Sequence, residues 1–154
     1  MATDTTVLND AAIALLATLQ TGIDDAGWDI TAKIAAGEPA QLCDGVNVWV
    51  DQIDPDYGTG GGSCVSASRV RFKYTIGDCI GADLSETLIF QHAAEHHGKA
   101  WAIWAELVNA CCGSTLLGTQ ADTVRVGALN LTTTQGGMFV WTGTVTGVLS
   151  PLAL

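Results

Sequence analysis

Hydrophobic positions in the first part of the chain recur at helical spacing. Behind Asn9 and Asp10, apolar side chains recur 3, 4, 7 and 11 residues after the first, at Ala12, Leu15, Leu16, Leu19 and Ile23. This period places them on one face of a helix, and Asn9 or Asp10 can cap its start. The pattern therefore predicts an amphipathic helix.

Two later segments alternate between apolar and polar residues. In "VNVWVDQI" the valines alternate with Asn47, Trp49 and Asp51, and in "SRVRFKYTI" the inward set is Val70, Phe72, Tyr74 and Ile76. A period of two is typical of strands. The glycine-rich stretch at about 54–65 is too rich in Asp, Gly and Pro to continue a strand. The pattern predicts a hairpin around a flexible loop.

A helical period returns after residue 83. Asp83 followed by Glu86 resembles a capping box, and an apolar stripe follows at Ile89, Ala93, Ala100, Ile103 and Leu107. Gly113 is a plausible C-terminal stop. The pattern predicts one long helix over residues 84–111.

Alternation reappears in the last third of the chain. "TVRVGALNL" and "MFVWTGTVTGVL" flank "TTTQGG", with Phe139, Trp141, Val145 and Leu149 on one face. The predicted order is helix, β-hairpin, long helix, β-hairpin. It indicates a single α+β domain over residues 1–154, with the helices packed on an antiparallel or mixed four-stranded sheet.

Charge limits the classes of partner. The chain carries 16 acidic residues against 6 basic ones, a formal net charge of −10. Affinity for phosphate comes mainly from lysine and arginine, so specific DNA binding is not expected, although DNA could pass an acidic wall. The N-terminus lacks the pattern of a signal peptide, and "AAIALLATL" is too short to span a bilayer. We expect a cytoplasmic site of synthesis and no membrane partner.

The outward face of the first predicted hairpin carries three of the six basic residues. A hairpin centred near Gly60 would set Asp51 opposite Arg69, Trp49 opposite Arg71 and Asn47 opposite Lys73. These pairs could be internal, as a cross-strand ion pair and a cation–π contact. Alternatively, the stripe could meet another chain, because Trp and Arg are enriched at interface hot spots. The candidate interface residues are Trp49, Asp51, Asp54, Asp56, Tyr57, Arg69, Arg71 and Lys73.

The motif "HAAEHHG" fits H-x-x-E-H, in which two histidines bind zinc and the glutamate activates water. Helical spacing places His92 and His96 on one face, but catalytic zinc normally takes a third protein ligand. Glu106 lies too far along the same helix, and nothing marks Asp122 for that role. The alternative is a half-exposed helix face with Glu95 and Lys99 as an ion pair. We predict no catalytic, cofactor-binding or metal site. The alternative hypothesis, from a different class of function, is a small zinc hydrolase that uses the HAAEH motif.

Hairpin geometry also predicts where the cysteines meet. Cys43 should fall near Cys79 at the open end of the first hairpin. The long helix should return Cys111 or Cys112 toward Cys64 at the loop end. In a reducing cytosol both pairs are expected to be thiols.

Several motifs carry a resemblance to a known class of protein. "LCDGVNVWV", "ASRVRFKYTIGDC", "WAELVNACCG" and "GGMFVWTGTVTGVL" occur in an order that resembles the tail terminator and head-to-tail connector proteins of long-tailed phages of actinobacterial hosts. The resemblance covers roughly residues 40–149. It leaves open the choice between the terminator and a neighbouring connector or stopper protein.

The resemblance implies a structural virion protein without catalysis or cofactor. Such a protein forms a ring, commonly hexameric, that caps the tail tube and joins it to the head connector proteins. Its expected place is the head–tail junction of the virion, after assembly in the host cytoplasm. DNA would pass through the lumen of the ring without specific binding.

Overall fold

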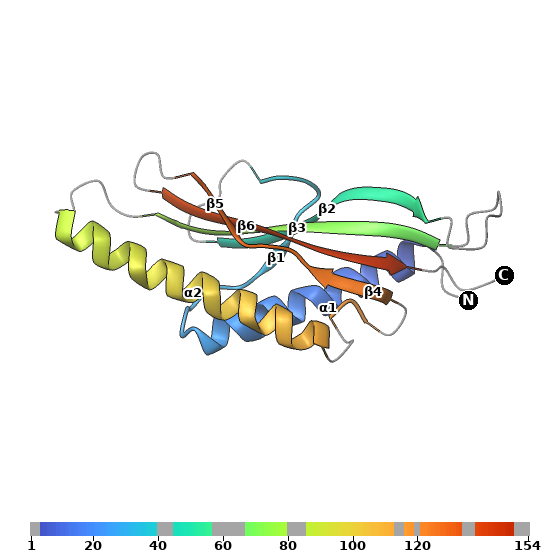
Figure 1. The fold of residues 1–154 in the computed structure, drawn as a ribbon, viewed down its shortest axis with the longest axis horizontal. Coiled ribbons are helices and arrows are strands. Elements are labelled where there is room, and N and C mark those ends of the chain that lie inside the picture. Colours follow the sequence, from blue (N-terminus) through green and yellow to red (C-terminus); the bar gives the residue numbers. More distant parts are fainter. Residues whose placement is uncertain are drawn as a thin grey trace.

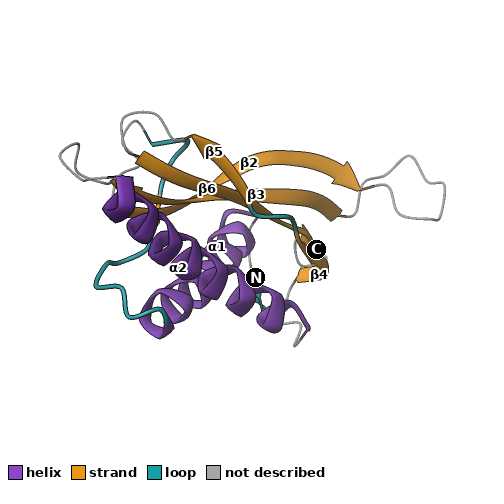
Figure 2. Ribbon diagram, turned by 60° about the vertical axis from the view of Figure 1, so that its left-hand side comes forward, coloured by secondary structure: helices purple, strands orange, loops and turns teal. Residues whose placement is uncertain are grey.

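Two helices lie on one face of a six-stranded mixed sheet in the computed structural model, which describes residues 4–39, 45–56, 67–79, 86–112, 116–118, 121–133 and 138–149 (Figure 1). The helices are α1 (Asp4–Asp25) and α2 (Glu86–Cys112). The strands are β1 (Lys33–Ile34), β2 (Gly45–Asp56), β3 (Ala67–Cys79), β4 (Ala121–Val126), β5 (Asn130–Thr133) and β6 (Met138–Leu149). Figure 2 shows the helices as one layer beneath the strands. The α+β class is confirmed, but the described sheet has six strands instead of the expected four.

The sheet is continuous and does not divide into two separate hairpins. Its strand order is β1-β2-β3-β6-β4, and β5 also pairs with β6. β3 and β6 are antiparallel along almost their whole length, from Ser68 opposite Leu149 to Cys79 opposite Met138. The predicted strand "TVRVGALNL" is interrupted, because Gly127, Ala128 and Leu129 separate β4 from β5. The last strand of the described chain is therefore central to the sheet.

The register of β2 on β3 differs from the prediction. Trp49 lies opposite Lys73 instead of Arg71, and Asn47 lies opposite Thr75 instead of Lys73. The register shifts between Val50 and Gln52, so Asp51 has no direct partner in the ladder. A β-bulge of this kind places an extra residue in one strand. The symmetric hairpin assumed from the sequence could not include it.

The loop after β2 begins later than predicted, because β2 continues to Asp56. Asp54, Pro55 and Asp56 continue β2 and lie opposite Arg69, Ser68 and Ala67. Pro55 fits there because, among the described strands, β1 covers this edge of β2 only at Asn47 and Val48, and proline is tolerated on an edge strand. The remainder of the predicted loop, residues 57–65, lies outside the described residues.

The core forms between the inner face of the sheet and the two helices. The predicted inward residues of β3 are all buried: Val70, Phe72, Tyr74 and Ile76. They meet Leu15, Leu19 and Ile23 of α1 and the predicted stripe of α2 at Ala100, Ile103 and Leu107 in a single cluster. Helix α1 begins at Asp4, before the predicted caps Asn9 and Asp10, and this extension adds the buried Val7 to the core.

Residues 6–25 of α1 are, by length and composition alone, apolar enough to cross a membrane. The core helix of a soluble protein passes the same test. Here one face of α1 is buried against the sheet and α2, with Leu15, Leu19 and Ile23 fully covered. Packing in this core accounts for the apolar character of α1.

The two helices cross closely at Gly22. A Cβ atom added there would lie 2.7 Å from the Cα atom of Ile103, so only glycine permits this approach. Beside the crossing, the Gln20 side chain fixes the segment that leaves α1. Its Nε2 donates to the carbonyl of Ile30 at 3.1 Å, and its Oε1 accepts from the amide of Ala32 at 2.9 Å. α1 and the approach to β1 are therefore held together by one polar side chain.

Candidate partner interface on the outer face of the sheet

The face of the sheet opposite the helices gathers most of the positive charge. Paired residues on neighbouring antiparallel strands point to the same side. Arg71 lies opposite Thr146, which lies opposite Arg125 of β4, so all three belong to the outer face. With Arg69 and Lys73, four of the six basic residues of the chain form this surface, here called the basic face. Sequence reasoning placed three of them there and missed Arg125.

Within the described residues, Arg71 of the basic face forms an ion pair, whereas Lys73 and Arg125 form none. Asp51, at the bulge, accepts hydrogen bonds from Arg71, with Nη2 at 2.6 Å and Nε at 2.7 Å from its Oδ2. The side chains of Arg71 and Asp51 are 43% and 26% exposed, so the pair contributes little to stability. The bulge thus redirects Asp51 from its expected partner Arg69 to Arg71.

A groove of about 390 Å³ crosses the basic face. Two arginines and three threonines provide its polar lining, together with backbone of β4 and β6: Arg69, Arg125, Thr123, Thr144 and Thr146. Guanidinium groups and hydroxyls are donors suited to carboxylates. The groove can therefore accept acidic side chains of another protein surface.

Thr123 of β4 holds an unusual backbone conformation beside this groove. Its φ angle is 52°, and it lies within the register shift between Asp122 and Arg125. A positive φ in a β-branched residue costs of order ~1–3 kcal/mol. Such strain is found most often at functional surfaces. Here the irregular backbone determines where Arg125 stands next to β6.

Trp49 does not belong to the exposed part of this face. Its register places it on the outer face as expected, but opposite Lys73 instead of Arg71, and it is only 4% exposed. A buried tryptophan offers almost no surface to a partner. Trp49 is therefore not a contact residue of this face, and Arg71 pairs with Asp51 instead.

The structure describes the side chains of only some of the remaining residues of the predicted interface. Asp54 is exposed, lies opposite Arg69, and its Oδ2 accepts a hydrogen bond from Gln52 Nε2 at 2.6 Å. The side chain of Asp56 and the whole of Tyr57 lie outside the described residues. Asp51 and Asp54 therefore border the basic face on the β2 side.

The histidine motif occupies two different environments. His96 is fully buried, and its Nδ1 lies 3.6 Å from Asp78 Oδ2. Burial, followed by the charges of His97 and Lys99, lowers the pKa of His96 to about 4. The backbones of Ile76 and Phe139 act in the opposite direction, although neither ring nitrogen reaches hydrogen-bond geometry. His96 is thus a neutral core residue at pH 7.

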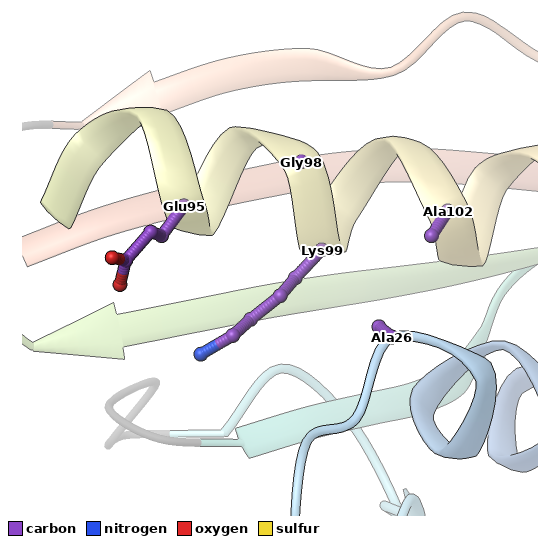
Figure 3. A pocket seen from close by; sticks show the side chains of 5 residues that line it. All are labelled: Ala26, Glu95, Gly98, Lys99 and Ala102. Carbon is purple, nitrogen blue, oxygen red and sulfur yellow. The ribbon is translucent and has the colours of Figure 1, made fainter. Parts of the chain in front are cut away.

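The neighbours of His96 also make contacts within the fold. His97 Nδ1 accepts a hydrogen bond from Trp141 Nε1 at 2.9 Å. Lys99 does not form the expected ion pair with Glu95, because its Nζ lies 5.0 Å from the centre of the Trp28 ring. Figure 3 shows Glu95 and Lys99 extending separately from α2, at the pocket that Ala26 also lines.

The positions of Glu95 and His96 show whether the described part of the H-x-x-E-H motif could form a zinc site. Among the described residues, no group of three His, Cys, Asp or Glu side chains is placed to hold a metal ion. The side chain of His92 lies outside the described residues. Glu95 is exposed, while His96 faces the core. The residues of H-x-x-E-H that are described therefore do not form one open site.

The cysteine predictions are only partly covered by the structure. Cys111 Sγ donates to the carbonyl of Val124 at 3.1 Å, and Cys112 is exposed. Cys43 and Cys64 lie outside the described residues, so both expected pairs do too.

Comparison with known proteins assigns the chain to no family: no protein-family model matches it, and neither does any curated protein.

Proposed function

We propose that this chain is a structural virion protein, the tail terminator of a long-tailed phage. Copies would form a ring, commonly of six, that caps the tail tube and joins it to the head connector proteins. DNA would pass through the lumen without specific binding, and the protein would need neither a cofactor nor a membrane. The order of motifs quoted above from residues 40–149 is the basis of this proposal.

One structural observation supports it: four of the six basic residues lie on the outer face of the sheet, where Asp51 and Asp54 border them on the β2 side. The basic face lies on the sheet, whereas exposed acidic side chains gather on the helical side at Asp10, Asp24, Asp25, Asp29 and Glu95. A ring of identical copies joins two different surfaces of the same protein. Opposite charges on those surfaces favour such contacts and disfavour contacts between like faces.

The test is to omit this protein from an assembling phage and examine the particles by electron microscopy. A terminator stops the growth of the tail tube and provides the surface that meets the head. We expect tails of irregular or excessive length and filled heads without tails. Restoring the wild-type chain should restore joined particles, with the protein at the head–tail junction.

The neighbouring connector or stopper role gives a different result. In that case the omission leaves tails of normal, uniform length beside unjoined heads. Normal particles in its absence would contradict both roles. About one bound zinc ion per chain, with hydrolytic activity that is lost on chelation, would instead support the alternative of a small zinc hydrolase.

A further inference from the structure

Unneutralised positive charge on the basic face is concentrated at two residues. Arg71 is paired with Asp51, and Arg69 lies opposite Asp54. Lys73 lies opposite Thr144, and Arg125 lines the groove next to Thr146. Since these two cations have no ion-pair partner in the described residues, they are the part of the face available to an acidic surface.

The end of α1 presents the complementary charge. Asp24 and Asp25 are exposed in its last turn, and Asp29 follows shortly after. That turn contains no basic residue, although the negative end of a helix dipole favours cations there. Lys99, on the neighbouring helix, is held over Trp28. Gln20 Nε2 donates to Asp24 Oδ1 at 3.0 Å, but no cation among the described residues forms an ion pair with Asp24, Asp25 or Asp29.

The two surfaces cannot meet within one molecule. Figures 1 and 2 show α1 in the layer of helices, with its C-terminal end away from the strands, and the strand register places the basic face on the other side of the sheet. We infer that the groove holding Arg125, together with Lys73, binds the acidic C-terminal end of α1 from a second copy of this chain. This inference rests on the proposed ring and names the surfaces that join its subunits.

The geometry makes this contact head-to-tail. Each copy would use its sheet groove toward one neighbour and its α1 end toward the other. Such a contact leaves one free surface of each kind until the series closes. In a closed ring, every groove contacts the α1 end of a neighbouring copy and no surface of either kind stays free. A face-to-face dimer would instead bring like charges together.

Nucleic acid is the competing occupant of a groove lined by arginine. The net charge of −10 opposes a polyanion, as do Asp51 and Asp54, which border the basic face on the β2 side, and Asp122, which lies opposite Val148 at the groove. A short acidic helix end carries less charge and can avoid these neighbours. A second copy is therefore favoured over DNA.

Two double charge reversals test this contact. The groove variant combines Lys73→Glu with Arg125→Glu, and the helix variant combines Asp24→Lys with Asp25→Lys. Each alone carries like charges on both joining surfaces and should self-associate at least about tenfold more weakly than the wild type. An equimolar mixture should regain association, because each surface then meets an opposite charge on the other variant.

Association is measured by sedimentation at low salt, up to the highest soluble concentration of the full chain. Zero-length carbodiimide cross-linking of mixed isotopic forms should join Lys73 to Asp24 or Asp25 between different chains. Lys33→Glu, on exposed β1, is the control for a change in net charge. Circular dichroism verifies that every variant is folded.

Several outcomes would overturn the inference. It is wrong if the wild type shows neither association nor intermolecular cross-links, if either variant associates like the wild type, or if the mixture does not recover. Loss of binding to a short DNA duplex in the groove variant, with self-association intact, would assign the groove to nucleic acid. The proposed function is judged separately by tail length and head joining, so head-to-tail contacts can hold in a protein that fails that test.

Discussion

Tyr74 of β3 lies opposite Gly143 of β6, and its phenol ring fills the space that a side chain at position 143 would need. Tyr74 is fully buried, and burial raises the pKa of its hydroxyl. The hydroxyl has no hydrogen-bond partner in the described structure. The ring is therefore held by packing alone, which makes the absence of a Cβ at Gly143 essential.

Gly143→Ala should destabilise the fold by about 2–4 kcal/mol, because the new methyl group would displace the Tyr74 ring from the core. The measurement is the free energy of unfolding in urea. Gly98→Ala is the matched control, since nothing lies within 4 Å of a Cβ at that exposed helical position. It should be neutral or stabilising, as helix propensity predicts. Equal effects at the two positions would contradict the packing argument.

Gln20→Ala should cost about 1–3 kcal/mol, because the carbonyl of Ile30 and the amide of Ala32 would both lose their partner. Hydrogen exchange should also rise at the Ala32 amide before it rises in the core strands. Thr21→Ala provides the comparison, since its hydroxyl bonds only to the carbonyl of Ala17 on an exposed helix surface. An unchanged exchange rate at Ala32 would show that Gln20 does not hold this segment.

Thr123→Gly should stabilise the protein by about 1 kcal/mol, despite the entropy cost of glycine, because it relieves a φ angle of 52°. The same substitution at Thr146, in the regular ladder opposite Arg71, should destabilise. Thermal unfolding of the two variants gives the signs. A loss of stability at both positions would mean that contacts of the Thr123 side chain outweigh its strain.

Stability should fall as the pH decreases from about 6.5 toward 4. The pKa of His96 is lowered from 6.5 to about 4 in the folded chain, so in this window the unfolded chain binds a proton that the folded chain does not. The free energy of unfolding should decrease by up to about 1.4 kcal/mol per pH unit from this group.

The His96→Phe variant isolates the contribution of this residue. It keeps an aromatic ring beside Trp28 and Phe139 but cannot titrate. Asp78 on β3, with His97 and Lys99 on α2, stays in place in both proteins. The slope of stability against pH should be smaller in the variant. A wild-type slope no steeper than that of the variant would show that Asp78 stabilises the protonated ring instead.

The elements were predictable where a simple period extends over many residues. Alternation along β3 identified Val70, Phe72, Tyr74 and Ile76 as core, and the helical stripe identified Ala100, Ile103 and Leu107. Both patterns arise from burial of one face, which the sequence records directly. The same logic predicted the outward direction of Arg69, Arg71 and Lys73.

The pairing and register of these strands were harder to predict from the sequence. A bulge at Asp51 shifts the register without a distinctive residue, and Trp49 became buried against expectation. Arg125 joined the basic face because β4 pairs with β6, a contact that short-range patterns do not specify. The alternation of Val124, Arg125 and Val126 could have indicated that its side chain points away from the core.

The position of β6 also has a consequence for the time course of folding. During synthesis, β1, β2 and β3 leave the ribosome long before β6, yet β6 is the strand that joins β3 to β4 and β5. Until it arrives, one edge of β3 is unpaired, and the core residues of α2 have no complete sheet to cover. Contacts between such distant segments slow folding and expose strand edges to wrong partners. The nascent chain should therefore be most prone to aggregation just before β6 emerges, and a chaperone that shields β3 would act in that interval.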